Sequence, residues 1–121
     1  MNIEEIRSYC LSKKGVTEEF PFDETTLVYK VMGKIFLLTD LESTGWINLK
    51  CDPEKAQDLR ERYPGVSPGY HMNKKHWNTV SLNHNLADRM IREWIDHSYE
   101  QVVAGLTLKM KEQLGKLFKT K

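Results

Sequence analysis

The hydrophobic and polar positions of the N-terminal segment follow a helical repeat. Apolar residues recur three and four positions apart, at Ile3, Ile6, Tyr9 and Cys10. This spacing places them on one face of a helix. Asn2 can cap that helix, with Glu5 completing a capping box, and Gly15 is placed to end it. Residues 16–24 are acidic and contain Pro21, which predicts a loop.

Alternating and β-branched positions then predict strands. Leu27–Met32 and Lys34–Thr39 flank Gly33, which accepts the positive φ of a tight hairpin turn. Trp46–Cys51 alternates apolar and polar residues and supplies a third strand. The short polar link at 40–45 predicts a second hairpin between antiparallel neighbours.

The helical repeat returns after Cys51. Asp52 and Pro53 are typical of a helix start, and Pro64–Gly65 ends that helix. A loop at 64–69 leads through 70–72 and a polar turn at Asn73–Lys75 into a strand from His76 to Leu82.

The longest predicted helix runs from Leu86 to Ala104 and ends at Gly105. Its apolar stripe contains Leu86, Met90, Ile91, Trp94, Ile95, Val102 and Val103. Thr107 can cap a last, basic helix. Strands clustered between helices and joined by hairpin-length links predict an α+β fold, with an antiparallel β-sheet and helices packed on one face.

Composition is that of an ordinary single domain, with 121 residues of which 40% are hydrophobic and 29% charged. No apolar run approaches the roughly 20 residues needed to cross a bilayer, and the first ten residues lack the basic start of a signal peptide. We therefore expect a cytoplasmic protein without a membrane partner. Cys10 and Cys51 are expected to be buried small hydrophobes.

The formal charge of +1 conceals an uneven distribution. Residues 107–121 contain five lysines and Glu112, a local charge of +4, whereas the remaining body carries −3. We expect an α+β domain at 1–106 and a basic C-terminal helix or tail at 107–121. The acidic body argues against a broad DNA-binding face, which would be basic overall.

Motifs for nucleotide binding, metalloproteases and nucleophilic hydrolases are absent from the sequence. We therefore expect no catalysis and no cofactor. His71 and His76 lie five positions apart without a placed carboxylate or thiolate, so no metal site is expected there. The acidic residues Glu18, Glu19, Asp23 and Glu24 lack the spacing of a calcium loop and are expected to be solvated.

The segment 70–78, with the sequence YHMNKKHWN, combines rings, lysines and amides. Lys74 and Lys75 can contact phosphates, while Tyr70, His71 and Trp77 can stack on exposed bases. In the alternative interpretation, the lysines serve solubility in a hairpin turn, and Trp77 and Tyr70 lie in the core. The candidate contact residues are Tyr70, His71, Asn73, Lys74, Lys75, His76 and Trp77.

The runs INLKCDP at 47–53, YPGV at 63–66 and PGYHMNKKHWNT at 68–79 resemble the MmcQ/YjbR family, and the likeness spans Ile3 to Leu106. The resemblance implies a frataxin-like (CyaY-like) α+β fold and DNA binding with a double-wing arrangement. It supplies no catalytic residues. Iron binding is not expected to accompany the fold, because the first helix carries Arg7, Lys13 and Lys14 beside its acidic residues.

A second hypothesis makes the chain a small-molecule or protein-binding domain that uses the Pro64–Trp77 surface. Pro64–Gly69, His71 and Trp77 would line a pocket with polar contacts from Asn48, Asn73 and Asn78. Buried polar side chains that converge on a concave site would favour this hypothesis. Lysines and rings that point outward would favour nucleic-acid binding.

Overall fold

A computed structural model describes residues 1–69 and 72–117. Four helices and six strands follow one another along these residues. In chain order they are α1 (Ile3–Leu11), β1 (Val16–Glu19), β2 (Thr26–Val31), β3 (Lys34–Asp40), β4 (Ser43–Lys50), α2 (Pro53–Arg62), β5 (Val66–Pro68), β6 (Trp77–Ser81), α3 (Asp88–Ala104) and α4 (Leu108–Lys116).

The six strands form one antiparallel sheet in the order β1-β2-β3-β4-β6-β5. The predicted hairpin about Gly33 is confirmed, since β2 and β3 meet there and both turn residues, Met32 and Gly33, have positive φ. The third predicted strand is also present, although β4 begins at Ser43, three residues earlier than expected.

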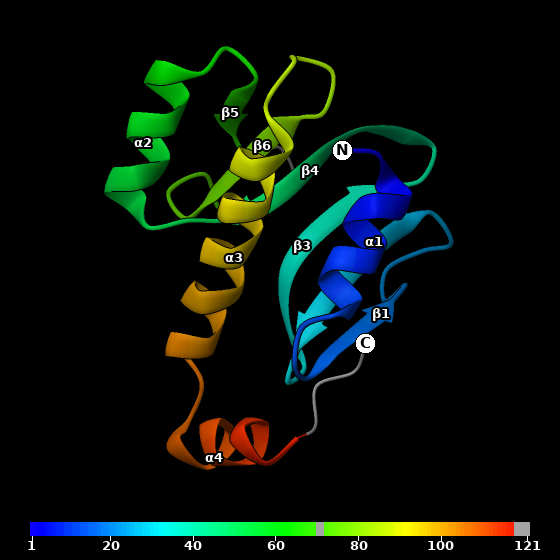
Figure 1. Ribbon diagram of the computed structural model, residues 1–121, viewed down its shortest axis with the longest axis vertical. Coiled ribbons are helices and arrows are strands. Elements are labelled where there is room, and N and C mark those ends of the chain that lie inside the picture. Colours follow the sequence, from blue (N-terminus) through cyan, green and yellow to red (C-terminus); the bar gives the residue numbers. More distant parts are fainter. Residues whose placement is uncertain (70–71, 118–121) are drawn as a thin grey trace.

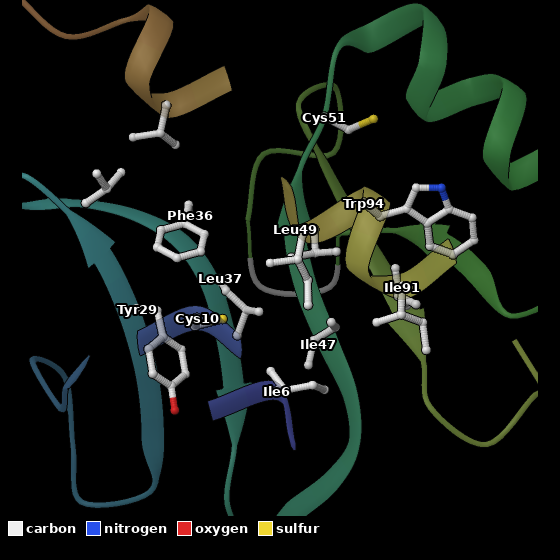
Figure 2. Close-up of a cluster of buried hydrophobic side chains, with 14 of the residues drawn as sticks. Ile6, Cys10, Tyr29, Phe36, Leu37, Ile47, Leu49, Cys51, Ile91 and Trp94 are labelled. Atoms are coloured by element: carbon white, nitrogen blue, oxygen red, sulfur yellow. The ribbon is translucent and has the colours of Figure 1, made fainter. Parts of the chain in front are cut away.

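Helices cover one face of this sheet, and the main hydrophobic core lies between the two layers. Figure 1 shows α1 and α3 in front of the strands, with α2 beside β5 and β6. In Figure 2, Ile6 of α1 and Ile91 of α3 lie over Leu37 and Ile47 of the sheet. Helix α4 adds Leu114 to the same cluster. The predicted α+β class, with helices on one face, is confirmed.

Helix boundaries follow the capping signals at most ends. Asn2 and Glu5 form the predicted capping box, and the Asp52 carboxylate accepts the Lys55 N–H at the start of α2. Thr107 caps α4 as predicted. The predicted end of α1 at Gly15 is wrong, because α1 ends at Leu11.

Two strands were missed by the sequence interpretation, which assigned both segments to loops. Val16–Glu19 is a strand that pairs with β2. Its carboxylates have partners on neighbouring elements: Tyr29 and Arg7 donate to Glu18, and Lys30 donates to Glu19. Val66–Pro68 pairs with β6 through only three residues, too few for an alternating pattern to show.

The opposite face of the sheet carries no helix in the described part of the chain, since all four helices contribute to the single core cluster. Strand alternation nevertheless places buried side chains there. Val28, Leu38 and Asn48 occupy directly paired positions on β2, β3 and β4, and each is at most 3% exposed. We call this surface the helix-free face.

Candidate nucleic-acid interface

The described part of the candidate contact segment is a tight turn between β5 and β6. The Asn73 side-chain oxygen accepts the Lys75 N–H at 2.8 Å, and the Asn73 carbonyl accepts the His76 N–H at 3.2 Å. An asparagine that bonds the backbone two residues on is a common turn-forming device. The His76 carbonyl then accepts the Cys51 N–H at 2.7 Å, which ties the turn to the end of β4.

Arg60 of α2 holds the same turn from the other side. Its guanidinium donates to the Asn78 side-chain oxygen at 2.6 Å, to the Trp77 carbonyl at 3.2 Å and to the Lys74 carbonyl. All three acceptors are neutral, and no carboxylate among the described residues pairs with Arg60. The turn is thus fixed by a cation whose charge is not neutralised. Arg60 was not among the predicted site residues, because an arginine on a helix of mixed charge gives no signal in the sequence.

Lys74 and Lys75 lie exposed on this turn. Neither ammonium forms an ion pair with any described carboxylate. With Arg60 behind them, three positive charges lie within a short stretch of surface on a body that is otherwise acidic. The predicted phosphate contacts are therefore brought together on an ordered scaffold.

Trp77 does not share this outward position. Its side chain is only 7% exposed, and the Gly69 N–H donates to its carbonyl at 2.7 Å. A side chain at Gly69 would lie 2.7 Å from the Trp77 Cβ, so glycine is required for this approach. The stacking role predicted for Trp77 is incompatible with its burial, and the alternative interpretation, a core position, describes it correctly.

The remaining candidate residues differ in position. Asn73 is exposed and His76 is half-buried. Tyr70 and His71 lie outside the described residues, so the predicted stacking of their rings stays a prediction. Of the seven candidate residues, the structure thus brings Asn73, Lys74, Lys75 and His76 together on one turn and places Trp77 in the interior.

The three asparagines of the second hypothesis do not converge. Asn73 is exposed on the turn, whereas Asn78 lies on the helix side of the sheet, where its amide donates to the Ala56 carbonyl at 3.3 Å. Asn48 lies on the opposite, helix-free face, where its side-chain oxygen accepts the Thr79 hydroxyl at 2.5 Å. These three described side chains therefore do not line one common pocket, and His71, the other polar residue of that hypothesis, lies outside the described residues.

Nucleophilic chemistry has little support in the described residues. Burial raises the pKa of the Cys10 thiol to about 12 and that of the Cys51 thiol to about 11, so both are protonated near neutral pH. Both cysteines are free and buried, which confirms the prediction. His97 is half-buried and its Nε2 accepts the Asp52 N–H at 3.1 Å. Burial, with a smaller contribution from Lys55, lowers the pKa of His97.

The acidic residues at 18–24 do not converge on a common point. Glu18 pairs with Arg7, Glu19 pairs with Lys30, and Asp23 accepts hydrogen bonds from Thr25 and Thr26. Among the residues that the structure describes, no group of three or more potential ligand side chains lies close enough to hold a metal ion. Within the same residues, no helix has the length and apolar character to span a membrane.

Comparison with known proteins assigns the chain to a family. A family model described as YjbR matches residues 11–101. The chain belongs to the YjbR family. Its matched region contains Arg60 and the whole of the candidate contact segment, and the predicted relationship is confirmed.

Two similar proteins come from Escherichia coli. YbdF of strain O157:H7 is 42% identical over 88 residues, which cover 72% of each chain. YjbR of strain K12 is 36% identical over 104 residues, which cover 85% of this chain and 88% of that protein. Both are described as uncharacterized proteins, so they supply the family and not an activity.

Solved structures agree with the fold. The crystal structure of the Deinococcus radiodurans protein DR2400, with a domain described as DUF419, has a TM-score of 0.88 at 35% identity, covering 99% of this chain and 91% of that one. A crystal structure of a Pseudomonas syringae protein has a TM-score of 0.72 at 28% identity, covering 84% of this chain and 98% of that one.

Proposed function

We propose that this YjbR-family protein binds DNA, and that Lys74 and Lys75 contact the phosphates. The observation that carries the proposal is the turn itself. Two exposed lysines without carboxylate partners in the described structure lie on a turn whose backbone Arg60 fixes. An ordered turn loses little conformational entropy on binding, which favours such a contact.

The burial of Trp77 removes one of the three rings predicted to stack on bases. Sequence-tolerant binding of single strands depends on rings that stack on bases, and the Trp77 ring is not available for this. Phosphate contacts carry no direct sequence information. We therefore propose that the protein contacts the DNA backbone with weak sequence preference, and that any stacking on bases falls to Tyr70 and His71 rather than to Trp77.

The number of lysines sets the expected salt dependence. Two phosphate contacts give a slope of about −1.8 in log affinity against log salt. Raising the salt from about 50 to 200 mM should then weaken binding about tenfold. The net charge of −3 on the body should prevent the affinity from approaching that of a strongly basic DNA-binding domain.

Fluorescence anisotropy with a labelled duplex can test the proposal. Lys74→Ala combined with Lys75→Ala should weaken binding and bring the salt slope close to zero. The matched control is Lys34→Ala combined with Arg89→Ala, which removes the same charge from two exposed positions on β3 and α3 and should leave the slope near the wild-type value.

Two results would contradict the proposal. One is the absence of binding to both duplex and single-stranded DNA at about 50 mM salt and micromolar protein, where weak electrostatic binding should be visible. The other is an equal loss of affinity in the control pair, which would show that net charge, and not the turn, determines binding.

A further inference from the structure

Exposed apolar side chains gather at one end of the sheet. Phe20 is 46% exposed and Phe22 is 64% exposed, both on the loop between β1 and β2. Leu41 is 40% exposed on the adjacent turn between β3 and β4, and its N–H donates to the Thr25 carbonyl of the loop at 2.8 Å. Neighbouring exposed apolar groups of this size mark interaction sites, whereas single ones need no explanation. We call Phe20, Phe22 and Leu41 the loop patch.

Local hydrogen bonds fix the loop that carries this patch. The Asp23 carboxylate accepts the N–H of Thr25 at 2.9 Å and that of Thr26 at 2.6 Å, together with both threonine hydroxyls. These bonds hold the chain directly after Phe22, so the exposure of its ring belongs to the folded loop. An apolar group on a fixed loop loses little conformational entropy when a partner covers it.

Carboxylates border the loop patch along the chain. Four of them form no ion pair with a cation in the described part of the chain: Asp23, Glu24, Asp40 and Glu42. These four groups give the border a charge of −4. A phosphate backbone or an anionic membrane would be repelled here. The complement of the loop patch is an apolar protein surface bordered by cations.

Helix α4 carries such a surface on the same chain. Leu108 is 76% exposed, and Leu117, directly after the helix, is 43% exposed. Three lysines of α4 are exposed and form no ion pair with any described carboxylate: Lys109, Lys111 and Lys116. Glu112 is the one acidic residue of α4, so the helix carries +2. We call this the α4 surface.

The loop patch and the α4 surface lie at opposite ends of β2. A side chain at Gly15 would lie 2.6 Å from Leu114 Cδ1 of α4 and 3.4 Å from Met32 Sδ, so α4 packs near the turn that joins β2 to β3. Figure 1 shows α4 at the bottom of the view, near this turn. The loop patch lies at the other end of β2, a strand of six residues that spans about 17 Å. The two surfaces can therefore meet only between two molecules.

We propose that the loop patch of one copy docks on the α4 surface of a second copy. Phe22 and Leu108 are the most exposed apolar side chains of the two surfaces, and they cover each other. The lysines of α4 then face the carboxylates beside the loop, which sets the orientation of the contact. This contact uses neither Lys74 nor Lys75, so it is independent of the proposed DNA binding.

The size of the loop patch sets the strength of the contact. Its exposed fractions correspond to about 300 Å² of apolar surface. A stable interface buries about 800 Å² on each partner. Association should therefore be weak, with a dissociation constant of about 0.1–1 mM, and it should weaken further as salt screens the opposite charges.

Sedimentation velocity over a range of protein concentrations up to about 1 mM, at about 50 mM salt, tests the contact. The mean sedimentation coefficient of the wild type should rise with concentration. Phe22→Ser and Leu108→Ser, both at exposed positions, should each weaken association at least tenfold. A wild-type protein that stays monomeric throughout, or association that neither variant weakens, would overturn the proposal.

Charge reversal tests whether the two surfaces pair with each other. Glu24→Lys combined with Glu42→Lys makes the border of the loop patch basic, and Lys109→Glu combined with Lys111→Glu makes α4 acidic. Each double variant alone should remain monomeric, because like charges then meet. An equimolar mixture should associate, since each loop patch again finds an α4 surface of opposite charge. A mixture that stays monomeric would overturn the proposal.

A matched variant controls for net charge. Glu61→Lys combined with Glu93→Lys changes the net charge as the loop variant does, at exposed positions on α2 and α3. It should associate within about twofold of the wild type. A loss as large as that of the Glu24→Lys and Glu42→Lys variant would show that net charge determines association, and would also overturn the proposal.

Discussion

Replacing Arg60 by methionine removes the guanidinium that joins α2 to the 73–77 turn and keeps an unbranched side chain of similar reach. Wild-type Arg60 donates to the Asn78 side-chain oxygen and to two backbone carbonyls. Asn78 is 2% exposed, so its oxygen becomes a buried acceptor without this donor. The substitution therefore tests whether Arg60 fixes the turn.

The expected loss follows from these three bonds. Leaving one buried acceptor unpaired costs about 1–3 kcal/mol, and a hydrogen bond from a charged donor contributes about 1.5–3 kcal/mol before solvent exposure weakens it. The bond to Lys74 lies at the surface and should contribute little. We expect the free energy of unfolding to fall by about 2–4 kcal/mol.

Arg62 provides a matched control two residues further along α2. Its side chain is 66% exposed and lies 3.6 Å from Asp58, a surface pair expected to contribute at most about 0.5 kcal/mol. Urea unfolding of Arg60→Met and Arg62→Met measures both losses under the same conditions. Amide exchange at residues 74–77 should also accelerate in Arg60→Met alone. A loss in Arg60→Met no larger than that in Arg62→Met would refute the assigned role.

Two further predictions concern stability. His97 has a lowered pKa in the folded protein, whereas in the unfolded chain its pKa returns to the ordinary histidine value of about 6.5. The unfolded chain therefore binds more protons as the pH drops from about 7.5 to 5.5, and the free energy of unfolding should fall over that range. Urea midpoints should fall less in His97→Gln, which keeps an acceptor for the Asp52 N–H; equal falls would show that other groups dominate. Gly15→Ala should destabilise the protein by at least about 1 kcal/mol, because φ is +71° and a Cβ would lie 2.6 Å from Leu114 Cδ1. Gly115→Ala, in α4 with open space around it, should stabilise the protein by about 0.5–1 kcal/mol. Thermal unfolding measures the change in melting temperature of Gly15→Ala and of Gly115→Ala. Changes of the same sign in both variants would contradict this reasoning.

Local signals in the sequence predicted the elements whose determinants are local. Asn2, Asp52 and Thr107 start helices through bonds to residues three positions away, and the turn at Gly33 depends on its own backbone conformation. Strand β1 could not be recognised in this way. Its Glu18 is stabilised by Tyr29 and Arg7, each eleven positions away, so the acidic residues suggested a loop.

The sequence predicted which charged residues form the candidate site, and it did not predict how the site is folded. Lys74 and Lys75 were identified because a polar turn exposes its lysines. The burial of Trp77 depends on the approach of Gly69, and the role of Arg60 depends on contacts up to eighteen positions away. The Asn48 side-chain nitrogen is buried without a hydrogen-bond partner among the described residues, and no local pattern in the sequence indicates this.

The two edge strands determine how molecules of this protein can associate. Strand β1 is short and carries two glutamates, and β5 has only three residues and ends in Pro68. Charge, brevity and proline each hinder the addition of a foreign strand to an exposed sheet edge. Growth of the sheet from one molecule into the next is therefore disfavoured at both ends. Association of this protein through side-chain surfaces is therefore favoured over pairing of sheet edges.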